Sequence, residues 1–239
     1  MIGIIEKSKK INKKQILKSK ITKWGLIFGN LGYFSVFLIG ILIAIFIGPN
    51  GYNPYYNAIS DLGNSYITPF PFLFDLKAYI GSFLFISIVF LVKKKLADTN
   101  PLRDNFFRKK EIPKNLIKSG LTFGIIGAVG YTFVGIFNLD RPGPNGLYHG
   151  LFAVVTFGGL IISTSIFSFY ILVLKVNISK IFAIYGLTLP FLSVILWFVS
   201  KIVLFEWISF FSILGFLMPF QSKRFIQGLS NVIGVNMAI

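Results

Sequence analysis

Six long apolar stretches dominate the sequence, and each is long enough, or nearly so, to cross a bilayer as a helix of about 20 residues. They lie near residues 24–48, 76–92, 119–138, 147–174, 181–198 and 203–220. Composition agrees, because 54% of the residues are hydrophobic and 13% are charged, whereas soluble domains carry about 25% charged residues. The predicted fold class is therefore all-α: a polytopic membrane protein with a bundle of six transmembrane helices.

The last two stretches are the hardest to separate, because between Ile181 and Phe220 only Lys201 and Glu206 are charged. A straight helix of that length would extend about 60 Å, about twice the hydrocarbon thickness of a bilayer. A reversal of the chain is therefore expected near Lys201–Glu206, although neither Gly nor Pro marks it.

The positions of the basic residues predict the orientation in the membrane. Of the 24 Lys and Arg residues, all but Lys77, Arg141 and Lys201 fall before residue 24, in 93–118, in 175–180 or in the tail. The positive-inside rule then places both termini in the cytoplasm of a multi-pass plasma-membrane protein. Lys77 is expected to extend its ammonium group to the membrane interface.

This charge distribution also predicts the organisation of the chain. Residues 1–23 form a basic cytoplasmic segment, 24–220 the six-helix membrane domain and 221–239 a cytoplasmic tail. Membrane insertion and attraction to anionic lipid account for the net charge of +16, so the expected partners are membrane lipids and no nucleic acid. A cleaved signal peptide is not expected, because the first apolar stretch is too long.

Metal and cofactor chemistry find little support in the sequence. There is no Cys and one His, whereas zinc sites need three or four N, S or carboxylate ligands. No nucleotide-binding loop, Ser-His-Asp order or HExxH motif is present, so we expect neither a cofactor nor a metal and assign no catalytic residue. The oligomeric state stays open.

Polar residues gather on the predicted outer side. Asp61, Asp75, Asp140, Glu206 and the only histidine, His149, all fall there. Ionisable groups at membrane depth usually face a protein interior or a wet cavity. Asp75 is expected to cap the second helix, and Asp140 to pair with Arg141 in the turn between helices three and four.

The stretch "PYYNAISDLGNSY" is the most polar part of that side. Asn53 before Pro54 is typical of a helix start, and Gly63 of a helix end, which predicts a short interfacial helix. We expect Ser60 and Asp61 to turn inward at its end, toward His149. Asp61 is then either a brace of its own loop or a ligand contact, and His149 either a helix-end hydrogen-bonding group or part of a site.

The candidate ligand-binding residues for a lipid or small molecule on the outer face are Ser60, Asp61, Asp140, Arg141 and His149.

A family resemblance rests on three stretches: "NAISDLGNSYITPFPFLFDLKAYIGSFLF", "GIIGAVGYTFVGIFNLD" and "LYHGLFAVVTFGG". Together they resemble the six-helix membrane family known as domain of unknown function 998. The I-S-D-L-G element with downstream Pro and Phe is also similar, more distantly, to the Frag/DRAM/Sfk-type membrane family, which includes proteins of GPI-anchor lipid remodelling. The likeness covers about residues 24–220 and implies an outer-face site that includes Ser60, Asp61 and His149. The closer family has no established reaction.

Three classes of function remain. The favoured class is a protein that binds or handles a lipid, or binds a partner, through the outer polar site. The second is a membrane-embedded lipid hydrolase or acyltransferase, with His149 as general base and Asp61 orienting it, although no Ser or Thr nucleophile stands near His149 in sequence. The third is a small-solute or ion transporter; against it, Glu206 is the one candidate for a charge at mid-helix, and no broken helix is evident beyond Pro190. The sequence leaves open whether the protein is an enzyme.

Overall fold

The structure, a computed structural model, describes residues 2–98, 112–173 and 178–222 of the 239-residue chain. Within these ranges the chain is helical and contains no strand. Six helices are long and apolar enough to cross a membrane, which confirms the predicted fold class. The α-helices are α1 (Ile2–Phe46), α2 (Phe72–Asp98), α3 (Ile112–Ile136), α4 (Leu147–Val173), α5 (Lys180–Ser200) and α6 (Leu204–Leu217). The short 3₁₀ helices are η1 (Ile59–Gly63), η2 (Pro144–Gly146) and η3 (Met218–Gln221).

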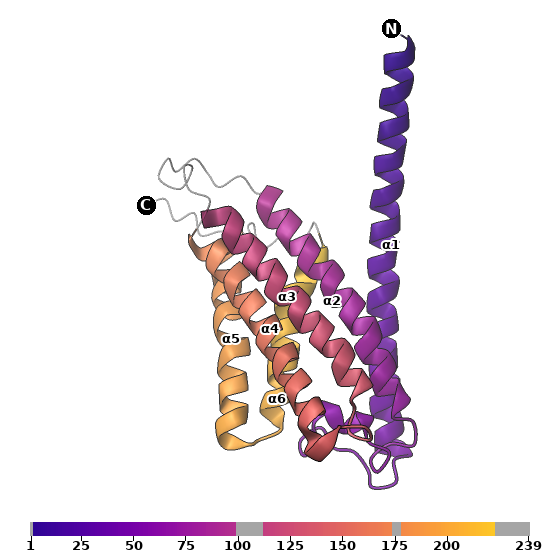
Figure 1. Cartoon of the computed structure of the whole chain (residues 1–239), viewed down its shortest axis with the longest axis vertical. Helices are drawn as coiled ribbons and strands as arrows, with labels where there is room; N and C mark the ends of the chain where they lie inside the picture. The colour runs from indigo at the N-terminus through magenta and orange to yellow at the C-terminus, as the bar shows by residue number, and fades with distance from the viewer. Residues whose placement is uncertain (1, 99–111, 174–177, 223–239) are drawn as a thin grey trace.

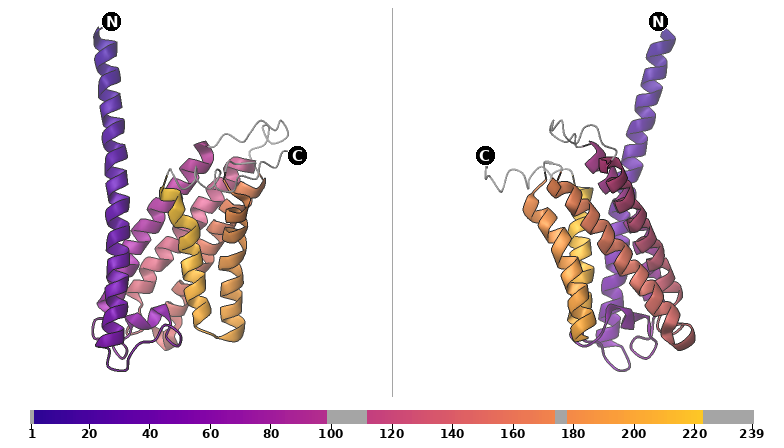
Figure 2. Two further views of the ribbon diagram at one scale, coloured as in Figure 1. Left: turned by 180° about the vertical axis from the view of Figure 1, so that it is seen from behind. Right: turned by 60° about the vertical axis from the view of Figure 1, so that its left-hand side comes forward.

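The helices run up and down, so that three connections gather at one end of the bundle (Figure 1). These connections are residues 47–71, 137–146 and 201–203, and we refer to this end as the loop end. Helix α1 extends well beyond the other helices at the opposite end (Figures 1 and 2). Because the described chain crosses the bundle six times, the start of α1 and the end of η3 lie on the same side.

Helices extend past the apolar stretches that predicted them. Helix α2 continues to Asp98 and α3 begins at Ile112, so both enter the basic segment 93–118. Helix α1 likewise runs through the predicted 1–23 segment. Hydropathy reports the part of a helix that lies in hydrocarbon, whereas backbone hydrogen bonding continues into the polar surroundings. Residues 223–239 of the predicted tail lie outside the described part.

The predicted reversal between the last two helices is confirmed. Helix α5 ends at Ser200, and Lys201 adopts the left-handed conformation with φ 58°. Its N–H donates to the Trp197 carbonyl, which closes the helix as a glycine usually does. A non-glycine residue in this position explains why the sequence carries no obvious mark of the turn.

Small residues allow α3 and α4 to lie in close contact. A Cβ atom at Gly127 would stand 2.7 Å from the backbone nitrogen of Leu160, and one at Gly159 only 2.6 Å from the nitrogen of Gly127. The two backbones therefore touch, as small residues permit between helices in lipid. This contact fixes α4 against α3 along its length and leaves the other side of α4 free to border a cavity.

The even number of crossings leads to a test of topology. We expect a reporter fused after Ile239 to be cytoplasmic, because the basic residues concentrate at the end of the bundle away from the loop end. A reporter fused after Lys201, in the loop between α5 and α6, is the control and should be on the opposite side. Both reporters on one side would mean that α6 does not cross the membrane.

Candidate functional site

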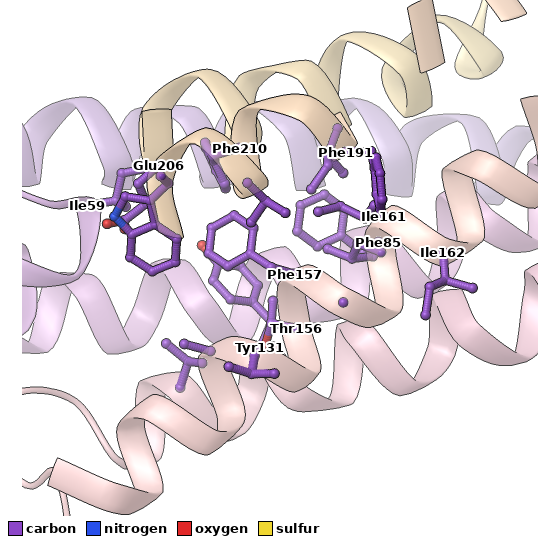
Figure 3. A pocket seen from close by; sticks show the side chains of 18 of the residues that line it. Ile59, Phe85, Tyr131, Thr156, Phe157, Ile161, Ile162, Phe191, Glu206 and Phe210 are labelled. Atoms are coloured by element: carbon purple, nitrogen blue, oxygen red, sulfur yellow. The ribbon is translucent and has the colours of Figure 1, made fainter. Parts of the chain in front are cut away.

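A large cavity lies inside the bundle, between α3 and α4 on one side and α5 and α6 on the other. Its volume is about 870 Å³, within the range of about 300–1,000 Å³ that ligand pockets span. Figure 3 shows Ile59 and Glu206 at one end, and Phe191 and Ile162 toward the other. Most of the wall is formed by Ile, Leu, Val and Phe side chains.

The cavity is long rather than round. Its lining on α4 runs from His149 to Phe169, which corresponds to about 30 Å along a helix. Its lining on α3 extends from Leu116 to Val134. The cavity therefore follows the helices over about the thickness of a bilayer core.

One side of the cavity borders the outer surface of the bundle. Helices α4 and α5 lie close together away from the loop end and diverge toward it (Figures 1 and 2). Val154 of α4 and Phe191 of α5 both line the cavity, yet they are 56% and 52% exposed. In a membrane these exposed apolar side chains would contact lipid, so the cavity opens sideways between α4 and α5.

The charged side chains of the cavity and its imidazole lie at the loop end. Ser60, Lys77, His149 and Glu206 all line it there. His149 and Glu206 are each two residues from the start of their helices, and Lys77 is five residues into α2, which places them within about 8 Å of the helix ends. The cavity thus combines a long apolar body with a short polar end.

Lys77 is the least expected of these groups. Its side chain is 1% exposed, and its ammonium nitrogen has no hydrogen-bond partner within the described part of the chain. The nitrogen lies 4.4 Å from the ring centre of Phe74 and 4.5 Å from that of Phe37. The prediction that Lys77 extends to the interface is wrong, because this contact with the two aromatic rings holds the ammonium group inside the bundle.

Glu206 holds the first loop over the polar end. The carboxylate is buried and faces the backbone N–H groups of Ile59 and Ser60. The neighbouring Trp207 donates its indole N–H to the carbonyl of Asn57, at 3.0 Å. Helix α6 therefore anchors η1, and this anchor brings Ser60 to the cavity.

Tyr52 secures the same loop from the other side. Its hydroxyl donates to the carbonyl of Ala58 at 2.9 Å. Burial, and the negative charges of Asp61 and Glu206, raise the pKa of Tyr52. The phenol therefore stays protonated and keeps donating this hydrogen bond across the ordinary pH range.

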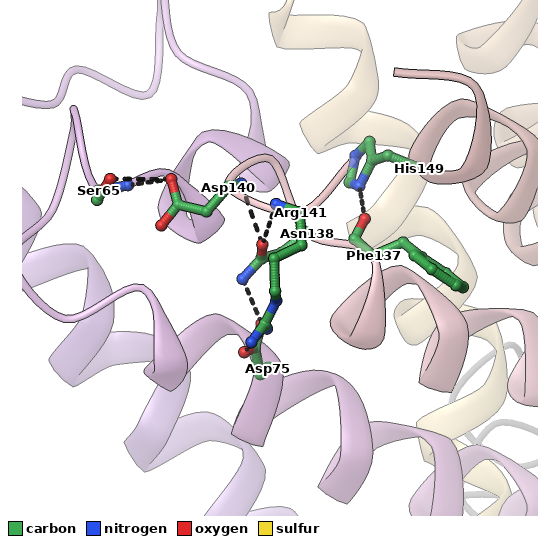
Figure 4. Close-up of polar contacts among 7 residues, drawn as sticks. All are labelled: Ser65, Asp75, Phe137, Asn138, Asp140, Arg141 and His149. Atoms are coloured by element: carbon green, nitrogen blue, oxygen red, sulfur yellow. Dashed lines mark hydrogen bonds and ion pairs between the residues drawn. The ribbon is translucent and has the colours of Figure 1, made fainter. Parts of the chain in front are cut away.

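His149 lines the cavity and is held by the end of α3. Its Nδ1 lies 2.7 Å from the carbonyl oxygen of Phe137 (Figure 4). A carbonyl can only accept, so Nδ1 carries the proton, and in the neutral ring Nε2 is left as an acceptor. Both Ser60 and His149, predicted as candidates, are thus placed on the cavity.

Asp61 is engaged by its own loop. Its carboxylate accepts from the backbone N–H of Ala58 at 2.8 Å and from the side-chain amide of Asn57 at 3.3 Å. It forms no direct hydrogen bond with His149 among the described residues, and it is not among those that line the cavity. Asp61 therefore braces η1, the shorter 3₁₀ helix that takes the place of the predicted interfacial helix.

Asp140 and Arg141 belong to a separate network that joins the first two connections at the loop end (Figure 4). The Asp140 carboxylate accepts from the N–H and hydroxyl of Ser65, and Arg141 forms an ion pair with Asp75. The buried Asn138 amide also donates to Asp75, at 2.8 Å. The predicted pairing of Asp140 with Arg141 is therefore wrong, and so is the prediction of Asp75 as a cap, because Asp75 lies within the first turn of α2.

Sequence reasoning missed Lys77 and Glu206 as parts of one polar end. The two residues lie far apart in the chain, and each interrupts an apolar stretch near its edge, where a single charge is usually taken to reach the interface. Their position beside Ser60 and His149 follows only from how α2, α4 and α6 pack.

Comparison with known protein families gives a match over most of the chain. No curated protein and no solved structure matches the chain. Residues 24–222 match the family described as the Frag1/DRAM/Sfk1/Cwh43P N-terminal domain. This is the family that the sequence resembled more distantly, and the likeness to domain of unknown function 998 gains no support. The match includes all six helices from Trp24 onward, and the chain therefore belongs to the Frag1/DRAM/Sfk1/Cwh43P N-terminal-domain family of membrane proteins.

Proposed function

We propose that this integral membrane protein binds a single membrane lipid in the cavity between α3, α4, α5 and α6. The polar group of the lipid would lie at the loop end, beside Lys77, His149 and Glu206, and a hydrocarbon chain would extend along α4. The observation that carries the proposal is the shape and chemistry of the cavity, a mainly apolar body over about 30 Å with its charged side chains and the imidazole of His149 at one end.

An amphiphile fits these features better than a compact water-soluble molecule. A polar solute would leave most of its hydrogen-bonding groups against Ile, Leu and Phe side chains, which is unfavourable. The opening between α4 and α5 lies among exposed apolar side chains such as Val154 and Phe191, so a lipid chain could enter without crossing water.

Binding is favoured over hydrolysis by the position of Asp61. A His-based hydrolase would need an activated nucleophile beside the ring and a group that orients the base. Here the Nδ1 of His149 donates to the carbonyl of Phe137, and the Asp61 carboxylate is engaged by Ala58 and Asn57. The arrangement supplies polar contacts for a ligand but, among the residues that the structure describes, no acid hydrogen-bonded to His149.

The basic residues orient the site. If both termini are cytoplasmic, the loop end faces outward and the polar groups lie at the depth of the outer headgroups. We therefore propose that the bound lipid comes from the outer leaflet of the plasma membrane.

Filling the cavity tests this function. Gly158 lines the cavity on α4, and a Cβ atom there would meet nothing within 4 Å. We expect Gly158→Phe to occupy the cavity without displacing a helix and to weaken lipid binding at least about tenfold, which corresponds to about 1.4 kcal/mol. The measurement is the amount of lipid extracted per mole of purified protein, determined by mass spectrometry.

Gly25→Phe is the matched control. Gly25 also has open space around its Cβ position, but it lies on α1 and away from the cavity. We expect this variant to retain the wild-type lipid content. A folded Gly158→Phe variant that carries as much lipid as the wild type would refute the proposed function.

A further inference from the structure

We propose that Lys77 is the receptor for an acidic group with one negative charge, a phosphate diester or a carboxylate, on the bound lipid. This inference rests on the proposed function and specifies the chemistry of the lipid's polar group. It starts from a buried cation that faces the cavity and has unused hydrogen-bond donors.

The aromatic rings around Lys77 attract its positive charge, but they offer no oxygen acceptors to its N–H groups. The ammonium nitrogen lies within 5.8 Å of the ring centres of Phe37, Phe74, Tyr131 and Phe210. Aromatic faces attract a cation, but they are poor substitutes for the oxygen acceptors that an ammonium group binds through its three N–H bonds. A buried ammonium group without such acceptors is unfavourable, so an oxygen ligand at this position would be strongly favoured.

The nearby carboxylate does not serve as that acceptor. Glu206 attracts Lys77 electrostatically, but its carboxylate faces the N–H groups of Ile59 and Ser60, and no ion pair links it to Lys77 among the described residues. The two side chains therefore border the polar end separately. Lys77 borders two hollows, and the one beside Leu62 and Thr68 has a volume of only about 10 Å³, so the room for an oxygen ligand is in the cavity.

The charges around the site limit the ligand to a single negative charge. Lys77 is the only Lys or Arg among the described residues that line the cavity, whereas Glu206 lines it and Asp61 lies near Glu206. A second negative charge on the ligand would lack a cationic partner and would be repelled by these carboxylates. A phosphate diester or a carboxylate offers oxygen acceptors to Lys77 and carries a single negative charge. A phosphate monoester carries more than one negative charge and does not fit.

The test compares three single-chain probes that differ in their polar group. They are oleoyl-lysophosphatidylglycerol, with a phosphate diester; oleic acid, with a carboxylate; and monooleoylglycerol, which is uncharged. Each is added to delipidated wild-type protein in a neutral detergent, and binding is measured by native mass spectrometry. We expect at least one acidic probe to bind at least about tenfold more tightly than monooleoylglycerol, and which one does so identifies the acidic group.

Lys77→Met tests whether Lys77 provides this preference. Met keeps an unbranched apolar side chain among the rings, so we expect the affinity for the acidic probe to fall to that for monooleoylglycerol and the preference to disappear. Lys118→Met removes an equal charge from an exposed position on α3, outside the cavity, and should bind all three probes like the wild type. If Lys77→Met does not fold, Lys77→Gln is measured in its place against the same expectations.

Two results would overturn the assignment while leaving lipid binding intact: equal affinity of the wild type for all three probes, or an unchanged preference in the Lys77 variant. The assignment would also be overturned if Lys118→Met weakened binding of the acidic probe as much as Lys77→Met does, because the preference would then reflect the general surface charge. Binding of none of the probes by the wild type would refute the proposed function itself.

Discussion

Gly127→Leu is expected to prevent the protein from folding stably in detergent. Even the first added atom would lie 2.7 Å from the backbone nitrogen of Leu160 and 3.0 Å from the carbonyl carbon of Gly159. Backbone atoms of a helix cannot rotate aside as a side chain can. Overpacking costs about 1–3 kcal/mol where neighbours can adjust, and here α3 and α4 would have to separate, so we expect about 3 kcal/mol or more.

The measurement is the thermal unfolding midpoint of the purified protein, together with its elution profile. Gly25→Leu is the control, because this exposed glycine of α1 lies outside the cavity and has nothing within 4 Å of its Cβ position. That variant should unfold close to the wild-type temperature. A Gly127→Leu variant as stable as the Gly25→Leu control would show that the two helices are not in backbone contact.

Asp75→Ala is expected to give the second large effect, a loss of about 1–3 kcal/mol of stability, because the buried Asn138 amide would lose its acceptor. The ion pair with Arg141 should add less than about 1 kcal/mol, since the arginine side chain is 59% exposed. Asp140→Ala is the control: Asp140 is exposed and binds only at the surface, to Ser65. Unfolding midpoints of the two variants in the same detergent provide the comparison.

Double-mutant cycles separate the two partners of Asp75. We expect the coupling energy between Asp75 and Asn138 to exceed that between Asp75 and Arg141. The opposite order would mean that the exposed ion pair, and not the buried amide, joins the start of α2 to the connection between α3 and α4.

The six membrane spans could be predicted because hydropathy reports the length of chain in lipid, and a reversal near Lys201 follows from the thickness of a bilayer. The bracing of the loop by Asp61 could be proposed from the sequence as one alternative, because its partners Ala58 and Asn57 are three and four residues away. Local contacts of this kind depend on sequence spacing alone. They are the contacts of a site that can be predicted from a single sequence.

The surroundings of Lys77 could not be predicted. The rings around its ammonium group come from α1, α2, α3 and α6, at Phe37, Phe74, Tyr131 and Phe210. A chain with 28 Phe residues offers many alternative neighbours for any one lysine, and spacing does not choose among them. Only the packing of four helices brings these rings together and turns an apparent interface residue into a buried cation.

The sideways opening between α4 and α5 determines whether the occupancy of the site depends on the ligand concentration in the membrane or in water. A ligand that enters from the bilayer is drawn from a two-dimensional solution, so occupancy follows its mole fraction among the membrane lipids and not its amount in water. Dissolved analogues without a hydrocarbon chain would compete poorly, however well their polar group matched. The protein would therefore respond to the composition of the membrane around it.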